Sequence, residues 1–314
     1  MKRKVVIPLG SFEKRYIIDE DGNLLDTLIL HKGEDIGIVS KSKNLTPQQI
    51  NVSEQKKKVK EYNKRMGGFI MCCFVSNELL FNSLNLDLPS ISRIIYLSTY
   101  LSYNSKEEGL LVIHQEGKKD IPMTRQMMQK KLKLSERTFS RFLADVKKSG
   151  LLFSVDDKHY INPQYISKGE CKFSNKEYTR IYIDKVRYLY EYSTVSQHKQ
   201  LSYVFQLIPY LHYQLNVVCH NPNETDKMKV KRMTLSEICE LLNVDIDNRF
   251  KLKKNLLRFH VDIYGYKYYL FSYITVEVLD GKKDFFAVNP SVLWRGDNVD
   301  EINEVIKGLV FNIL

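Results

Sequence analysis

The chain contains an internal repeat, and this constrains its fold more than any other feature of the sequence. The motif Asn-Pro-x5-Gly starts at Asn162 and again at Asn289, so the offset in residue number between the two copies, from 162 to 289, is 127. Upstream, the motif YLSY starting at Tyr100 returns as YLHY starting at Tyr210, where the offset, from 100 to 210, is 110. An offset that grows from 110 to 127 along the chain indicates a duplicated domain whose second copy carries an insertion.

Composition and charge narrow the classes of partner. A length of 314 residues allows about two to three domains of roughly 100–200 residues each. The formal net charge of +11 favours an anionic partner, either nucleic acid or a membrane surface. No apolar run reaches the roughly 18 residues of a spanning helix, and no signal peptide is recognisable, so we expect a cytoplasmic protein without membrane association. The five cysteines are unevenly spaced, which predicts reduced, buried thiols.

The first repeat has the element order of a winged helix. A long apolar helix from about residue 90 to 103 precedes two helices, TRQMMQKKL and ERTFSRFLADVKKS, that are separated by a short connection. Ser135 is the predicted N-cap of the second of these helices, and Gly150 ends it. Two short strands with a turn at Asp156 and Asp157 follow. Helix, turn, helix and a two-stranded wing is the order that defines a winged-helix domain.

The second repeat follows the same order. Thr234 and Glu237 form a capping box at the start of TLSEICELLNV, and DNRFKLKKNLLRF stands where the next helix belongs. The apolar and aromatic residues after it predict a much longer wing that holds the whole insertion. Its aromatic side chains are expected to pack against the domain or a partner subunit, with stacking on single-stranded bases as the alternative.

The predicted fold class is therefore α+β, with tandem winged-helix domains at residues 67–172 and 173–298. An N-terminal β-hairpin region is expected over residues 1–43, with its turn at Asp21 and Gly22. A basic linker helix is expected over residues 44–66, either as a solvated connection or as an arm along phosphates. A C-terminal helix over residues 299–314 completes the chain.

The outward face of ERTFSRFLADVKKS is the first candidate nucleic-acid surface. Its apolar residues repeat at helical spacing and form a buried stripe, and a winged helix inserts this helix into the major groove. The alternative is an ordinary surface helix with ion pairs such as Arg141 to Asp145. The predicted base contacts are Arg137, Ser140 and Arg141, and the predicted phosphate contacts are Lys147 and Lys148.

The matching helix of the second repeat and the loop before it carry a denser positive charge. Like charges one helical turn apart repel each other, and an external polyanion would offset that repulsion. The predicted DNA contacts of this repeat are Arg249, Lys251, Lys253, Lys254 and Arg258 on the helix and Lys229, Lys231 and Arg232 in the loop.

Catalytic motifs are missing from the sequence. It contains no His-x-His pair, no His-Glu-x-x-His motif, no phosphate-binding Gly-x4-Gly-Lys-Ser/Thr loop and no nucleophile elbow. Cys219, His220 and Cys239 lack the Cys-x-x-Cys spacing of a zinc site. We therefore expect a protein that is not an enzyme and that binds no metal or cofactor.

The run from Phe69 to Gly169 resembles the winged-helix replication proteins of Firmicute plasmids and related phages. In those proteins a segment like YTRIYIDKVRYL, an apolar helix, a helix-turn-helix and a wing closing on Asn-Pro-x5-Gly occur in this order. The tandem arrangement is similar to plasmid initiators that use two winged-helix domains to bind iterated origin repeats. This resemblance implies sequence-specific binding of double-stranded DNA during replication initiation. A homodimer and contacts with host replication or transcription proteins are further expectations.

Two other functions stay open at this point. A phage or mobile-element transcriptional regulator would present the same DNA surface. A non-enzymatic scaffold that binds host polymerase or RNA belongs to a different class, because it would need no defined DNA site.

Overall fold

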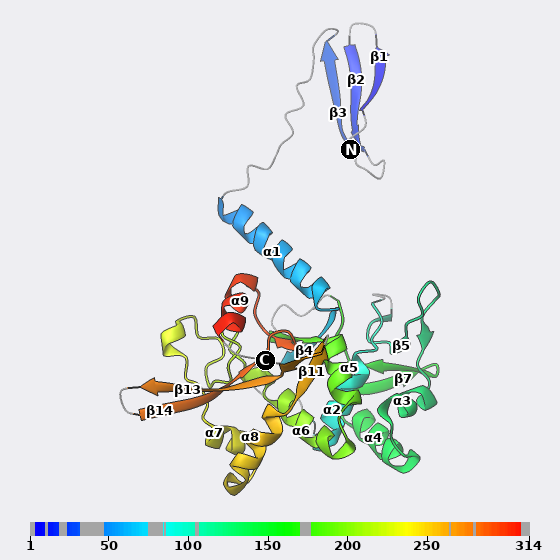
Figure 1. Ribbon diagram of the computed structural model, residues 1–314. Coiled ribbons are helices and arrows are strands. Elements are labelled where there is room, and N and C mark those ends of the chain that lie inside the picture. Colours follow the sequence, from blue (N-terminus) through cyan, green and yellow to red (C-terminus); the bar gives the residue numbers. More distant parts are fainter. Residues whose placement is uncertain are drawn as a thin grey trace. The chain divides into compact units, whose positions relative to one another are not determined.

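The chain forms an α+β structure of helices and small sheets, which confirms the α+β class that the sequence predicts (Figure 1). The computed structural model describes residues 4–9, 12–18, 24–31, 47–74, 84, 86–103, 107–169, 177–263, 265–278 and 281–308. The chain divides into two units, Met1–Asn51 and Val52–Leu314. The domain boundaries predicted within the second unit stay predictions.

The first unit holds a three-stranded antiparallel sheet of order β1-β2-β3. The expected hairpin corresponds to β2 (Phe12–Ile18) and β3 (Leu24–His31), and β1 (Lys4–Leu9) adds a strand that the sequence analysis did not single out. The predicted turn at Asp21 and Gly22 lies outside the described residues. The predicted basic linker corresponds to α1 (Pro47–Arg65), which continues from this unit into the next.

The central sheet of the second unit takes one long and one short strand from each repeat. Its order is β15-β10-β4-β9, and all neighbouring strands are antiparallel. The long strands β4 (Phe69–Phe74) and β10 (Glu177–Tyr182) lie side by side in the middle. The outer strands β9 (Ile166–Ser167) and β15 (Leu293–Trp294) follow the two Asn-Pro motifs. The two repeats therefore build a single sheet in equivalent ways.

The core helices of the two repeats pack directly against each other. These are α2 (Leu88–Ser98) and α6 (Val195–Gln206). The backbone N–H of Ser92 donates to Oγ of Ser202 at 3.2 Å, and both serines are buried. Their separation along the chain is 110, the same as the offset of the sequence repeat, so equivalent positions touch each other. This is the arrangement expected when two copies pack around a local two-fold axis.

Local contacts downstream also recur at equivalent positions of the two repeats. Thr124 caps α3 (Arg125–Leu132) by accepting from the N–H of Met127, and Thr234 caps α7 (Leu235–Leu241) by accepting from the N–H of Glu237. Both helices are followed by a left-handed residue at the equivalent position, Lys133 with φ 54° and Asn243 with φ 50°. The second unit also contains the helices α4 (Glu136–Lys148), α5 (Ile183–Glu191), η2 (Ile208–Tyr210), η3 (Lys227–Lys229), η4 (Ile246–Asn248) and α8 (Arg249–Leu257), and the short strands β5 (Val112–Ile113) and β6 (Ile121–Pro122).

The insertion of the second repeat divides between two places, which corrects the expectation that all of it lies in the wing. The hairpin predicted as the first wing pairs β7 (Leu152–Val155) with β8 (Lys158–Ile161), whereas β13 (Phe271–Val278) and β14 (Gly281–Val288), the strands of the second predicted wing, are twice as long. The longer strands account for about half of the insertion. The rest lies before the wing, where β11 (His260–Ile263) and β12 (Tyr266–Tyr269) form a separate hairpin.

The aromatic residues of this region have different surroundings. Phe271 is buried with its ring 5.7 Å from that of Phe286, and the ring of Tyr273 lies 4.9 Å from Phe286. Tyr266 on the hairpin is exposed. The wing aromatics Phe271 and Tyr273 therefore pack within the chain, as the sequence analysis favoured.

A small aromatic cluster attaches the C-terminal half of α1 to the second unit. Tyr62 is buried, and its ring lies 5.1 Å from that of Trp294 at an angle of 70°. Lys58 Nζ of the same helix lies 2.7 Å from Asp300 Oδ2 in α9 (Val299–Gly308). The first part of the expected C-terminal helix thus corresponds to α9. The other lysines in this half of α1 are exposed, namely Lys56, Lys57, Lys60 and Lys64.

Candidate nucleic-acid interface

The helix α4 presents its basic side chains outward, as the periodicity predicts. Ser135 is its N-cap, and its apolar stripe is buried in the core. Arg137, Arg141, Lys147 and Lys148 are all exposed. Within the part of the chain that the structure describes, these four side chains form no ion pair and no hydrogen bond, and the Arg141–Asp145 pair that the alternative of a surface helix would need is not formed. The alternative of an ion-paired surface helix therefore loses its main contact.

Ser140 differs from the other predicted base contacts because it is bonded within the protein. The Arg125 guanidinium at the start of α3 donates to Ser140 Oγ at 2.7 Å and to Glu136 Oε1 at 2.6 Å. Ser140 in turn donates to Glu136 at 3.0 Å. The hydrogen bond from Arg125 holds the pKa of the Glu136 carboxyl below its usual range. This network fixes the N-terminal turns of α3 and α4 to each other, and it orients the helix rather than leaving Ser140 free.

Residues 246–257, which form η4 and α8, occupy the place of α4 in the second repeat. Leu252 and Leu256 are buried at the positions equivalent to the buried Phe142 and Val146. The phase of the second helix is therefore the same as that of the first. Its exposed residues include the predicted contacts Lys251, Lys254 and Arg258. Arg258 also donates to Oε1 of Gln200.

The other two predicted contacts on this helix lie on its inner edge. Arg249 is equivalent in position to the buried Phe139, and its guanidinium lies 4.7 Å from the centroid of the Phe250 ring. Lys253 has its ammonium 3.3 Å from the centroid of the Tyr273 ring in the wing strand β13. The structure thus separates two roles that charge density alone does not distinguish. Arg249 and Lys253 contact neighbouring aromatic rings, whereas Lys251 and Lys254 face outward.

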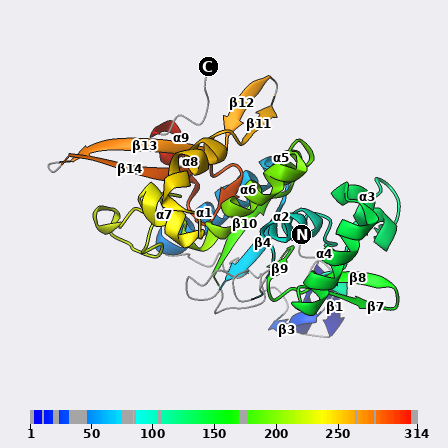
Figure 2. The same cartoon turned by 90° about the horizontal axis from the view of Figure 1, so that it is seen from below.

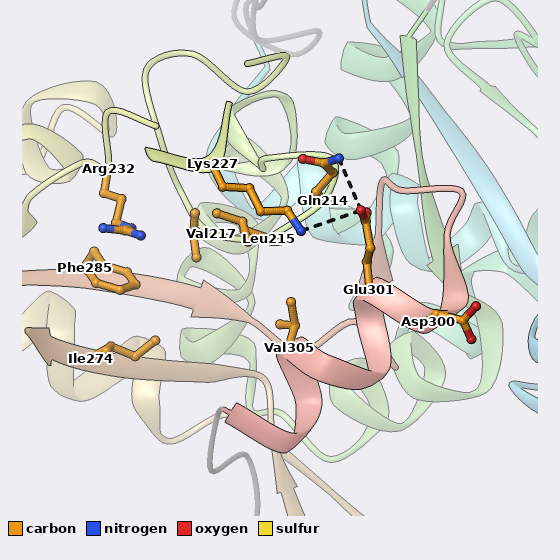
Figure 3. Close-up of a pocket in the computed structure, with 10 residues that line it drawn as sticks. All are labelled: Gln214, Leu215, Val217, Lys227, Arg232, Ile274, Phe285, Asp300, Glu301 and Val305. Atoms are coloured by element: carbon orange, nitrogen blue, oxygen red, sulfur yellow. Dashed lines mark hydrogen bonds and ion pairs between the residues drawn. The ribbon is translucent and has the colours of Figure 1, made fainter. Parts of the chain in front are cut away.

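The basic loop before α7 borders an apolar pocket of about 540 Å³, shown in Figure 3. The pocket lies between this loop, the second wing and α9. Lys227 pairs with Glu301 at 3.6 Å, and the Arg232 guanidinium lies 4.6 Å from the Phe285 ring centroid. Lys229 pairs with Asp226 at 3.4 Å. Among the predicted loop contacts, the Lys231 side chain is exposed and has no ion pair with a described residue.

The helices α4 and α8 lie on the same side of the second unit. Both lie at its lower edge in Figure 1 and toward the viewer in Figure 2, which is seen from below. The wings β7–β8 and β13–β14 extend in opposite directions in both views. The two helices that carry the exposed basic residues therefore lie on one side of the second unit, with a predicted wing at either end.

Two residues of the candidate interface were not predicted from the sequence. The role of Arg125 depends on its contacts with Glu136 and Ser140 across two helices. No local sequence pattern in α3 predicts these contacts. Phe250 is 66% exposed in the first turn of α8. It is equivalent in position to Ser140, so transfer of the first repeat's outward face onto the second would have identified it.

Several histidines and cysteines outside these helices lie in the interior. His159, His198 and His212 are buried, and burial lowers their pKa. Four of the five cysteines are buried, as expected, and burial raises the pKa of the Cys219 thiol to about 12. The fifth, Cys171, lies outside the described residues. No group of three or more His, Cys, Asp or Glu side chains within the described ranges could hold a metal ion.

No described helix combines the length and apolar character that crossing a membrane requires. Comparisons with protein-family models, with curated proteins and with solved structures found no match for this chain.

Proposed function

We propose that the chain is a sequence-specific double-stranded DNA-binding protein that initiates replication of a plasmid or phage. In this proposal each repeat is a winged-helix domain that places one helix, α4 or α8, in the major groove. The protein acts in the cytoplasm without catalysis or a cofactor, and host replication proteins are its further partners. The observation that carries the proposal is the pair of equivalent helices, α4 and α8, which lie on one side of the second unit (Figure 2) and each carry exposed basic side chains.

The chemistry of these faces supports DNA as the partner. Arginine reads guanine O6 and N7 in the major groove, and lysine neutralises phosphate. Arg137 and Arg141 are one turn apart on α4, and Lys251 and Lys254 are one turn apart on α8. Because these four side chains have no acidic partner among the described residues, an external polyanion would remove their mutual repulsion. The two wings would then contact the sugar-phosphate backbone of the DNA on either side of the two helices.

Recovery of bound fragments from the native replicon, followed by footprinting, is the direct test. We expect a defined site with two contacted major-groove segments and iterated copies of that site at the replication origin. Enrichment of a promoter operator instead would favour transcriptional regulation. If no defined site emerged, sequence-specific DNA binding would be wrong, and a scaffold function would take its place.

DNA affinity is expected to fall steeply with salt. If about six phosphates are neutralised, the slope of log affinity against log salt concentration should be about −5. Replacing Lys251 or Lys254 with Gln should make the slope shallower by about one each, as measured by fluorescence anisotropy. Lys60→Gln separates the two interpretations of α1: the slope should stay unchanged if this helix is a solvated connection and become shallower by about one if it lies along phosphates. A flat salt response of the unmodified chain would contradict the proposal.

A further inference from the structure

Phe250 is an apolar side chain in the middle of a basic face. It lies in the first turn of α8 and is 66% exposed, while Lys254 one turn later and the neighbouring Lys251 are exposed beside it. Ile246, one turn earlier, is also exposed at 43%. A single exposed apolar side chain is ordinary on a protein surface, but Phe250 and Ile246 lie together on the face proposed to meet DNA, where an apolar group could contact a base.

The protein itself covers little of the Phe250 ring. The Arg249 guanidinium lies 4.7 Å from the Phe250 ring centroid, and no aromatic ring in the described part of the chain packs against the Phe250 ring. The buried side of α8 is formed by Leu252 and Leu256, which point away from this face. Phe250 is therefore not needed to anchor α8 in the core. Its ring is held by a neighbouring cation and projects outward.

The position of Phe250 corresponds to that of Ser140 in the first repeat. Ser140 is bonded to Arg125 and Glu136. In the second repeat the equivalent position carries a ring that can form no such network. The two outward faces therefore offer different chemistry at the same place, with a polar network in the first and an apolar surface in the second.

We propose that Phe250, with Ile246 beside it, is a specificity-determining residue that contacts the 5-methyl group of a thymine in the major groove. Thymine offers this methyl group as an apolar contact in the groove, and aromatic and small apolar side chains pack on it. The surrounding lysines favour DNA over an apolar protein partner, because lysine is depleted at protein–protein interfaces. This inference rests on the proposed DNA binding.

Uracil substitution tests the inference, since uracil differs from thymine only by the missing methyl group. In the recovered site, each thymine is replaced in turn by uracil, and affinity is measured at constant salt. The unmodified chain should lose about fourfold in affinity at one thymine, which corresponds to the burial of one methyl group. The Phe250→Ala variant should bind the thymine and uracil sites equally. The Phe153→Ala variant, which removes an exposed ring from the first wing, should keep the fourfold difference.

The outcomes separate this inference from the proposed function. If the chain binds a defined site but no uracil substitution changes its affinity, the inference is wrong and the DNA-binding proposal stands. If Phe250→Ala keeps the same sensitivity to uracil, another residue contacts the methyl group and the inference is also wrong. If no defined DNA site exists, the proposed function itself fails. Because Phe250 is exposed, an unchanged melting temperature should show that the variant is folded.

Discussion

Replacing Arg137 and Arg141 together with Ala is expected to weaken binding to the specific DNA site by about 2–6 kcal/mol, at about 1–3 kcal/mol for each lost base contact. Both side chains are exposed on the outward face of α4 and have no ion pair within the described structure. Non-specific binding should fall less, because it depends mainly on phosphate contacts. The measurement is the ratio of specific to non-specific Kd at one salt concentration.

The matched control for the arginine variant is Lys147→Ala with Lys148→Ala on the same helix. Since these lysines are expected to meet phosphate, their loss should weaken specific and non-specific binding by similar factors. Neither double variant removes a core contact, so both should unfold at the temperature of the unmodified chain. If the arginine variant left the ratio of specific to non-specific affinity unchanged, α4 would not read the base sequence.

The sequence predicted the elements whose signals are local. The helix α4 begins after the N-cap Ser135 and is followed by the left-handed Gly150. The turn that joins the strands of the first wing contains Asp156 and Asp157, with φ values of 47° and 60°. These features depend on backbone preferences of single residues and on the spacing of the apolar stripe. Their positions could therefore be predicted without knowledge of the tertiary structure.

The hairpin β11–β12 could not be separated from the wing for the opposite reason. The run from Asp262 to Leu279 contains apolar and aromatic residues throughout, so its periodicity reads as one long strand. The structure ends β12 at Tyr269, buries Leu270 and starts β13 at Phe271. The backbone N–H of Leu270 donates to the carbonyl of Phe259, a contact that no local pattern encodes.

Two positions of the repeats have the same backbone conformation although their residue types differ. Gly109 (φ 84°) and Asn216 (φ 52°) are both left-handed, and their carbonyls accept from Ile161 and Val288 at the matching ends of the two wings. A Cβ atom at Gly109 would lie 2.2 Å from the Ile161 carbonyl oxygen. At Asn216 the side chain instead donates to the Val288 carbonyl at 2.8 Å. The same backbone requirement is met by different residues, so sequence comparison alone misses it.

For the candidate interface, the density of positive charge in the sequence identified the helix α8, but it did not identify which of its basic residues face outward. All five basic positions on the second helix looked equivalent in sequence, yet Arg249 and Lys253 contact aromatic rings while Lys251 and Lys254 face outward. The helical phase carried by the repeat distinguishes them, because Leu252 takes the place of the buried Phe142. Applying the repeat to side-chain direction, as well as to element order, would have recovered most of this arrangement.

The C-terminal half of the basic helix α1 is attached at the closing motif of the second copy. Trp294 follows the second Asn-Pro motif, pairs in the sheet through β15 and is fully buried. Its ring contacts Tyr62 of α1 and lies 4.9 Å from the Arg180 guanidinium on β10. One side chain therefore joins the central sheet to α1.

Trp294→Ala is accordingly expected to lower the free energy of unfolding by about 3–5 kcal/mol, the usual cost of truncating a fully buried large aromatic side chain. Urea denaturation followed by circular dichroism measures this loss. Because α1 would lose its main apolar contact, trypsin should also cleave faster after its exposed lysines, such as Lys60. Phe250→Ala, which removes a more exposed ring that does not anchor α8 in the core, is the control and should change neither quantity appreciably. If Trp294→Ala destabilised the chain without faster cleavage in α1, contacts such as the 2.7 Å pair of Lys58 with Asp300 would be sufficient to hold that helix.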